Sequence, residues 1–484
     1  MHSLPSASSH LSRRAFVHRS ALAAGALSVP SFLAGCGGPS GENSESATAA
    51  SDPSADAARF RLVTLDPGHF HAALVQKSMY PDVSPVVHVY APEGEELAQH
   101  VARIESYNTR AEAPTRWDLQ VHTGPDFLDR MIADRAGNIV VISGNNARKA
   151  EYIVRAVEAG FHVLADKPMA RTPADLERLE HAFRVAREGG VQLYDIMTER
   201  FEITSMLQRA LSKNASLFGD LEKGSPEAPA ITKESVHHFS KTVSGAPLIR
   251  PAWFFDVDQQ GEGIVDVTTH LVDLIQWTVF PEQSLTPEDI TMLQARRWTT
   301  PVSEAEFRKV TGASGFPDYL QDDVRDGALQ VYCNGEFTYR LRDVHAKVSV
   351  VWNFEAPEGT GDTHFSMMRG TRANLVIRQG ADEQFTPVLY VEPAATAGDG
   401  DAERVVREAI AAVQDEFPGV DVRRDGARWA VSVPASYAVG HEAHFGQVTE
   451  NFLAYVRDGS MPAWEVPAMR TKYATIMKAY EMSR

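Results

Sequence analysis

Short apolar runs alternate with amphipathic segments of helical period between residues 59 and 200. Strands are predicted at residues 60–65, 86–90, 119–122, 138–143, 161–164 and 191–194, and helices at residues 69–79, 93–107, 126–133, 147–159 and 173–188. Continuous apolar runs separated by helices are typical of a parallel sheet that is buried on both faces. The pattern therefore predicts an α/β domain over residues 59–200, a Rossmann-type doubly wound parallel sheet.

After residue 200 the apolar positions alternate mainly with period two. Strand-like runs cover residues 234–242, 328–332, 336–341, 347–354, 363–369 and 373–378, and helices are predicted at residues 263–278, 440–457 and 467–482. Turn residues such as Asn334-Gly335 separate several runs and favour antiparallel hairpins. Residues 201–484 are thus expected to form an α+β domain with a large mixed or antiparallel sheet.

The N-terminus carries the features of an export signal. Arg13-Arg14 precede a weakly apolar run that ends in Leu33-Ala34-Gly35-Cys36, and this run is shorter than the roughly 20 residues of a membrane-spanning helix. The arrangement resembles a twin-arginine signal followed by a lipobox, although an ordinary signal peptide with a chance Arg pair is the alternative. We expect residues 1–35 to be removed, Cys36 to be lipidated, and the protein to be exported to the cell envelope.

Composition narrows the function. Residues 37–58 are small or polar and include no large apolar side chain, so residues 36–58 are expected to form a flexible tether. The chain has 47 Lys and Arg against 64 Asp and Glu, a formal charge of −17, which argues against nucleic acid as a partner. Membrane contact is expected only through the lipid on Cys36, and Cys333 is the one other cysteine.

The first strand of the predicted Rossmann sheet leads into Asp66-Pro67-Gly68-His69-Phe70. This turn should face a cofactor's phosphates, because ligands of doubly wound sheets bind at the carboxyl ends of the strands. Only Gly68 remains of a G-x-G-x-x-G pattern, so a dinucleotide site and a structural turn are equally good interpretations. Gly68, His69 and Phe70 are candidate cofactor residues, and Glu93 is the nearest candidate partner for a ribose hydroxyl.

Two later strand ends add candidates for the same site. Ser143 and Asn145 follow the fourth strand, where Asn145 could instead cap the next helix. The fifth strand runs into Asp166-Lys167-Pro168, and the proline holds Lys167 in an extended backbone at the strand end. An ammonium there can bind a substrate hydroxyl and a cofactor ribose, although a surface lysine before a turn is the simpler interpretation.

The most chemical pattern lies in the predicted helix at residues 263–278. Asp266, His270 and Asp273 are spaced to share one helical face, and carboxylates beside an imidazole can set its tautomer and basicity. A general acid/base is the first interpretation, a buried structural histidine the second and a metal ligand the third. No H-E-x-x-H motif or third ligand accompanies His270, so we expect no metal.

Together these parts resemble the glucose-fructose oxidoreductase/inositol dehydrogenase (Gfo/Idh/MocA) family. The resemblance rests on the Asp166-Lys167-Pro168 strand end and on the run from Gly261 to Asp273. It implies NAD or NADP as cofactor and a secondary hydroxyl of a sugar, sugar derivative or cyclitol as substrate. It also implies that Lys167 positions substrate and cofactor, that His270 transfers the proton, and that Asp266 supports it and binds substrate.

Two departures from the family pattern leave alternatives open. The glycine-rich loop is reduced to Gly68, and residues 281–440 are longer than the family's usual second domain, with Trp298, Trp352 and the loop 359–362 unassigned. A nicotinamide-dependent glycosidase with transient oxidation is the enzymatic alternative, and a non-catalytic carbohydrate- or cofactor-binding lipoprotein is the other. Asp273 is a weaker substrate candidate, and the sequence leaves homo-oligomerisation open.

Overall fold

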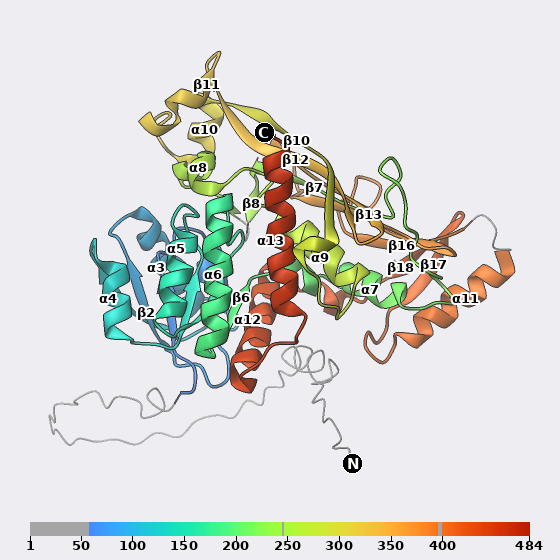
Figure 1. Cartoon of the computed structure of the whole chain (residues 1–484), viewed down its shortest axis with the longest axis horizontal. Helices are drawn as coiled ribbons and strands as arrows, with labels where there is room; N and C mark the ends of the chain where they lie inside the picture. Colours follow the sequence, from blue (N-terminus) through green and yellow to red (C-terminus); the bar gives the residue numbers. More distant parts are fainter. Residues whose placement is uncertain (1–57, 244–245, 395–398) are drawn as a thin grey trace, which may run out of the picture.

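The computed structural model describes residues 58–243, 246–394 and 399–484 (Figure 1). The predicted signal peptide, Cys36 and nearly all of the predicted tether lie outside the described residues. Within the described ranges, no helix combines the length and apolar character needed to cross a membrane.

The first domain is a six-stranded parallel sheet in the order β3-β2-β1-β4-β5-β6. This confirms the predicted Rossmann-type topology, whose strand order reverses between β1 and β4, the place where such sheets bind ligands. All residues of β1 and β4 are buried, as expected for the central strands. The strands are β1 (Leu62–Leu65), β2 (Val86–Ala91), β3 (Asp118–Thr123), β4 (Ile139–Ile142), β5 (His162–Ala165) and β6 (Leu193–Asp195).

Helices cover both faces of this sheet: α2 (His71–Val75), α3 (Glu95–Thr109), α4 (Phe127–Asp134), α5 (Lys149–Glu158) and α6 (Pro173–Gly189). Helix α2 is shorter than the predicted 69–79. Trp117 Nε1 donates a hydrogen bond to the Gln76 carbonyl (2.6 Å) and Arg110 to the Lys77 carbonyl (2.6 Å), so side chains occupy the acceptors that a longer helix would use. Pro81 has no N–H to extend it.

The second domain is built on a ten-stranded, mostly antiparallel sheet, as predicted. Its order is β10-β12-β13-β7-β14-β15-β16-β18-β17, with β11 paired to β12 and a single parallel pair between β13 and β7. The strands are β7 (Ile231–Ser240), β10 (Ile290–Ser303), β11 (Val324–Arg325), β12 (Ala328–Leu341), β13 (Val344–Glu355), β14 (Thr363–Arg369), β15 (Ala373–Arg378), β16 (Val388–Pro393), β17 (Asp421–Asp425) and β18 (Arg428–Ser432).

The chain's last two helices return to the first domain. Helix α12 (His441–Asp458) buries Phe445 and Phe452 in the core of the Rossmann domain, and α13 (Glu465–Met482) buries Met469 and Tyr473 there. In Figure 1, α13 stands between the Rossmann layers and the large sheet. It also packs on α9 (Thr268–Val279), which belongs to the second domain. The two domains are therefore joined by shared packing as well as by the chain.

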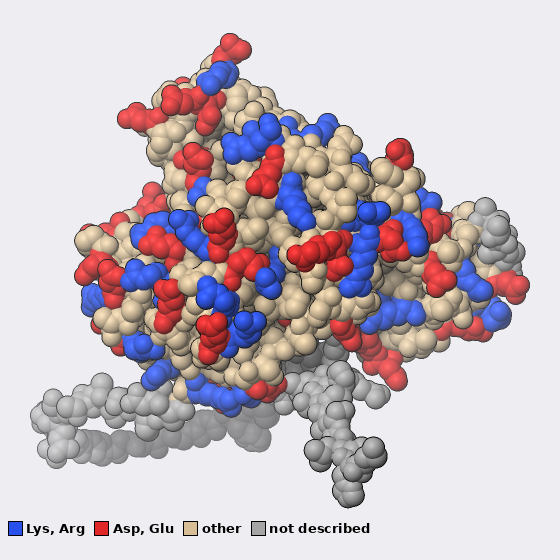
Figure 2. Space-filling model, viewed as in Figure 1, with Lys and Arg blue, Asp and Glu red and all other residues tan. Residues whose placement is uncertain are grey.

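Acidic and basic side chains are interspersed over the face shown in Figure 2. Many are paired locally, for example Arg404 with Glu408 and Arg308 with Glu304. Such exposed pairs contribute little to stability. On this face, acidic side chains are therefore not gathered into one patch.

Candidate active site

The carboxyl ends of β1 and β4 lie against each other. A Cβ on Gly144 would come within 2.1 Å of the Asp66 carbonyl oxygen, so the two turns touch through backbone alone. Gly68 N donates to Asp66 O (2.8 Å) and His69 N to Ser143 O (3.3 Å). The amides that would cradle a phosphate in a glycine-rich loop are therefore already satisfied within the protein.

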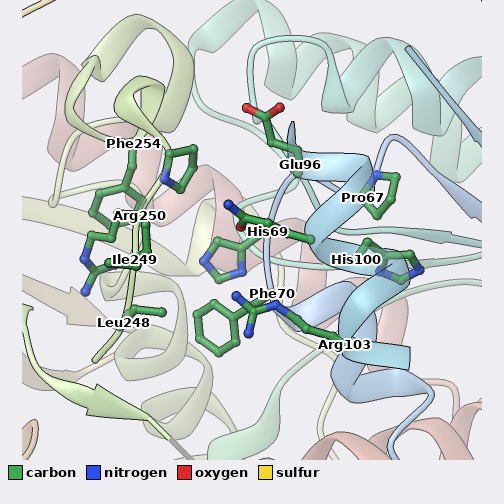
Figure 3. Close-up of a pocket in the computed structure, with 13 residues that line it drawn as sticks. Pro67, His69, Phe70, Glu96, His100, Arg103, Leu248, Ile249, Arg250 and Phe254 are labelled. Carbon is green, nitrogen blue, oxygen red and sulfur yellow. The ribbon is translucent and has the colours of Figure 1, made fainter. Parts of the chain in front are cut away.

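A small cavity opens beside this turn (Figure 3). Gly68, His69 and Phe70, the predicted cofactor residues of this turn, line it, whereas Ser143 and Asn145 do not. Its other walls are α3 and the segment 248–254 of the second domain. In Figure 3 the guanidinium of Arg103 reaches the ring of Phe70, with 5.9 Å between the guanidinium carbon and the ring centroid.

The cavity has features that fit a dinucleotide. Arg103 has no ion-pair partner among the described residues, so its charge is available to a phosphate. Gly68 leaves backbone within reach of the cavity, and Glu96 from α3 lies at its edge (Figure 3). The site thus offers a cation and a nearby backbone turn to the phosphates of a dinucleotide.

Asp166, at the end of β5, is the most heavily bonded carboxylate of the site. Its Oδ2 accepts from His71 Nδ1 and from Ser143 Oγ, both at 2.9 Å, and its Oδ1 accepts from the Lys167 amide at 2.9 Å. Although burial opposes it, His71 and Lys149 hold the pKa of Asp166 well below its usual value. Ser143 and Asp166 therefore organise the floor of the site from within the protein.

Lys167 projects from the same strand end to the second domain. Its Nζ donates to Asp266 Oδ1 at 2.6 Å, and Gln260 Nε2 donates to the other carboxylate oxygen at 3.0 Å. Burial disfavours the ammonium, but Asp266 and Asp166 outweigh it and raise the pKa of Lys167. Lys167 is therefore a fixed cation at the junction of the two domains. The peptide bond between Lys167 and the buried Pro168 is cis.

His270 lies close to this pair, but its ring has no hydrogen-bond or ion-pair partner among the described residues, and Nδ1 is fully buried. Burial and the Lys167 ammonium lower the pKa of His270 to about 3, with Glu199 acting in the opposite direction. The imidazole is therefore neutral near pH 7. Glu199 is itself held by His441, whose Nδ1 is 3.2 Å from Oε1.

The predicted common helical face is wrong in two respects. Asp266 lies in the turn before α9, which begins at Thr268, so its position is set by Lys167 and Gln260 and not by helical spacing to His270. Asp273 points into a buried ion-pair network with Arg200 (2.6 and 2.7 Å) and Lys472 (2.9 Å) and is 1% exposed. Asp273 is therefore not a substrate residue and does not order His270.

Asn145, predicted either to bind the cofactor or to cap the next helix, makes contacts to both domains. Its Oδ1 accepts from the Ala147 amide (2.9 Å), while its Nδ2 donates to Gln259 Oε1 (2.8 Å) of the second domain. Glu93 accepts from Thr123 Oγ1 (3.3 Å) at the tip of β2, where its carboxylate stays at the surface. Asn145 thus ties the two domains together beside the cavity.

The loop 359–362 brings further residues that the sequence left unassigned. Asp362 Oδ2 accepts from Lys241 and from His237 Nδ1 (2.9 Å). His237 stacks on the buried ring of Trp352 at 5.1 Å between centroids, which makes Trp352 part of a core cluster. Burial is the main cause that lowers the pKa of Lys241, although Asp362 acts in the opposite direction.

Several site residues were not found from the sequence. No motif of their own marks these residues, which come from five separate elements: His71 from α2, Arg103 from α3, Lys149 from α5, Glu199 from the short helix η2 (Thr198–Phe201) and His441 from α12. The H-x-H spacing of His69 and His71 was the one available signal, and on its own it is compatible with many local structures.

Comparison with known proteins supports this architecture. Residues 68–194 match a family model described as "Oxidoreductase family, NAD-binding Rossmann fold", and residues 207–484 match one described as "Putative oxidoreductase C terminal domain". No curated protein matches the chain. A crystal structure of a "putative oxidoreductase" from Parabacteroides merdae is 52% identical, with a TM-score of 0.86, over 88% of this chain and 98% of the other.

More distant solved structures share the fold. A 3-ketoreductase from Actinomadura kijaniata, solved with NADP, is 14% identical with a TM-score of 0.51 over 87% of this chain and 96% of the other. A levoglucosan dehydrogenase solved with NADH and levoglucosan is 15% identical with a TM-score of 0.55 over 88% and 96%. At these identities the likeness concerns the fold alone. With both of its domains matched by the family models, the chain belongs to the Gfo/Idh/MocA family of oxidoreductases with an NAD-binding Rossmann domain.

Proposed function

We propose that this protein oxidises or reduces a secondary hydroxyl of a sugar, sugar derivative or cyclitol with a nicotinamide dinucleotide. The observation that carries the proposal is the unpartnered ring of His270 beside the fixed Lys167–Asp266 pair. A buried polar group without a partner is costly, and a substrate hydroxyl is a group that would satisfy it. The distant sugar-active relatives are consistent with such a substrate.

In the oxidative direction, His270 accepts the proton of the substrate hydroxyl. Its lowered pKa keeps it neutral, which is the form that can accept a proton. Lys167 donates a hydrogen bond to the same oxygen and stabilises the negative charge that develops there. Asp266 and Gln260 hold the ammonium in place, and the bound nicotinamide supplies the redox partner for the substrate carbon.

We further propose that NAD is preferred over NADP. Glu93 lies two residues after the end of β2, and Glu96 lines the cavity. A carboxylate at this edge of a Rossmann sheet hydrogen-bonds the ribose hydroxyls of NAD and repels the additional phosphate of NADP. Arg103 would then meet the phosphates that the two cofactors share.

The test is a spectrophotometric screen of sugars and cyclitols with the purified protein and NAD, monitored at about 340 nm. We expect one substrate class to be oxidised, with kcat at least about 100-fold lower for Lys167→Met and His270→Ala. The exposed residues Lys309 and His181 supply matched controls, Lys309→Met and His181→Ala, which should retain full activity. Full activity of both site variants would contradict the proposal. Cleavage of a glycoside without net absorbance change would favour the internal redox cycle.

For the location, we propose export and lipid anchoring at Cys36. The support is the order of the Arg13-Arg14 pair, the apolar run and the Leu33–Cys36 motif in the sequence. Mass spectrometry of the N-terminal peptide from a membrane fraction should find an acylated Cys36 and no residues 1–35. An unprocessed N-terminus in a soluble fraction, unchanged by Cys36→Ser, would contradict it.

A further inference from the structure

Three metal-binding side chains converge where the β1 turn meets the end of β5. The Nδ1 atoms of His71 and His69 lie 2.9 and 3.8 Å from Asp166 Oδ2, and the three ligand atoms all lie within 4.8 Å of one another. His69 and His71 are two residues apart at the start of α2, whereas Asp166 comes from the fifth strand. The group therefore exists only in the folded chain.

These separations match those of ligands around one ion. Zinc binds imidazole nitrogen and carboxylate oxygen at about 2.0–2.2 Å, which places neighbouring ligand atoms about 2.9 Å apart at right angles and about 3.4 Å apart in a tetrahedron. The measured 2.9 and 3.8 Å bracket these values. Small rotations of the His69 ring, which is the least buried of the three and lines the cavity, would complete the fit.

Hydrogen bonds orient the three side chains. The His71 amide donates to His69 Nδ1 (3.3 Å), and His71 Nδ1 lies at hydrogen-bond distance from Asp166 Oδ2 (2.9 Å). Ser143 Oγ also donates to Asp166 Oδ2 (2.9 Å) and so fixes the direction of the carboxylate. The Lys149 ammonium is turned to the Asp166 and Lys167 carbonyls and does not bond to the carboxylate.

We propose that His69, His71 and Asp166 bind one divalent transition-metal ion, with Zn²⁺ as the representative. Two imidazoles and one carboxylate form a common set for such ions and leave positions open for water or substrate oxygen. The ion would tie the start of α2 to the end of β5, beside Lys167. The ion would replace the hydrogen bond between His71 Nδ1 and Asp166 Oδ2, and His71 would then carry its ring proton on Nε2.

The test uses the purified full chain, freed of metal by a chelator and titrated with Zn²⁺ in a calorimeter. We expect one equivalent to bind with a Kd below about 1 µM. His69→Gln and His71→Gln should each weaken binding at least about tenfold. Co²⁺ should give visible d–d absorption bands in the parent protein that His69→Gln reduces.

A matched control is the second close histidine pair, His88 Nδ1 and His122 Nε2 at 2.9 Å, which has no carboxylate within ion-pair distance among the described residues. His122→Gln should leave Zn²⁺ stoichiometry and Kd unchanged. Asp166→Asn adds the third ligand, and because this residue is buried, circular dichroism should first establish that the variant folds. If Asp166→Asn does not fold, His69→Gln still tests the site, because His69 is partly exposed.

The proposal is overturned if the parent chain binds no Zn²⁺, if the ligand variants bind it as the parent does, or if His122→Gln abolishes binding. NADH binding, measured separately by fluorescence, tests the proposed function. A protein that binds NADH but no metal removes only the metal site, and one that binds metal but no dinucleotide removes only the proposed function.

Discussion

Replacing Asp273 by Asn should mainly lower the melting temperature, whereas the same replacement at Asp266 should mainly lower kcat/KM. Asp273 joins Arg200 through two hydrogen bonds of 2.6 and 2.7 Å and Lys472 through one of 2.9 Å. Lys472 is fully buried, and Arg200 is also bonded to Glu465. Asp273→Asn removes the negative charge between two buried cations while keeping the shape of the side chain.

The size of the effect follows from these contacts. Breaking a buried ion pair by removing one partner costs about 3–5 kcal/mol of unfolding free energy. At roughly 2–4 °C per kcal/mol for domains of this size, the melting temperature of Asp273→Asn should fall by about 6–20 °C. Asp195 and Glu465 remain as partners for the two cations, which places the expected value in the lower part of this range.

Asp266→Asn is the comparison, because the Asp266 carboxylate hydrogen-bonds to Lys167 and Gln260 and has no second buried cation bonded to it among the described residues. We expect a smaller fall in melting temperature and at least about a tenfold loss of kcat/KM, since Lys167 loses the carboxylate that holds it. Differential scanning fluorimetry and steady-state kinetics below the melting range measure both effects. An unchanged melting temperature together with a raised KM for Asp273→Asn would refute the assignment of Asp273 to the structural network.

Three further predictions concern the cofactor side. Gly144→Ala should weaken NADH binding by at least about tenfold, because its Cβ would overlap the Asp66 carbonyl at 2.1 Å, whereas Gly189→Ala, with nothing within 4 Å, should not; equal affinities would contradict the packing of the two turns. NADPH should bind at least about tenfold more weakly than NADH, and Glu93→Ser should narrow the gap; a tighter NADPH complex would contradict this role of Glu93. Burial lowers the pKa of His100 from 6.5 to about 4, so its contribution to stability is complete above pH 6.5 and is lost as pH falls toward 4, by up to about 1.4 kcal/mol per pH unit. His100→Leu should therefore flatten the acid side of the melting-temperature profile, and an unaltered slope would count against it.

Much of the fold could be predicted because its strands are buried on both faces and its helices are amphipathic. Strand β10 was missed because most of its residues are partly exposed, so its apolar signal is weak despite its length. The predicted length of α2 was wrong because side chains from distant residues, Trp117 and Arg110, occupy its last carbonyls. Such contacts have no signature in the local pattern.

The candidate site divides in the same way. A local motif placed Lys167 at the end of the fifth strand, and the structure pairs it there with Asp266 of the second domain. Helical spacing then misled for Asp273, because the helix begins after Asp266 and the buried partners of Asp273 come from distant segments. The convergence of His71 on Asp166 joins positions nearly a hundred residues apart and follows from topology alone.

The central claim is that this cleft holds a nicotinamide dinucleotide beside Lys167 and His270. The most direct measurement is a fluorescence titration of the purified protein with NADH, together with mass identification of any nucleotide released by acid. The account predicts saturable binding of about one NADH per chain, in the micromolar range or tighter, that Gly144→Ala weakens. The absence of both released nucleotide and saturable NADH binding would contradict it.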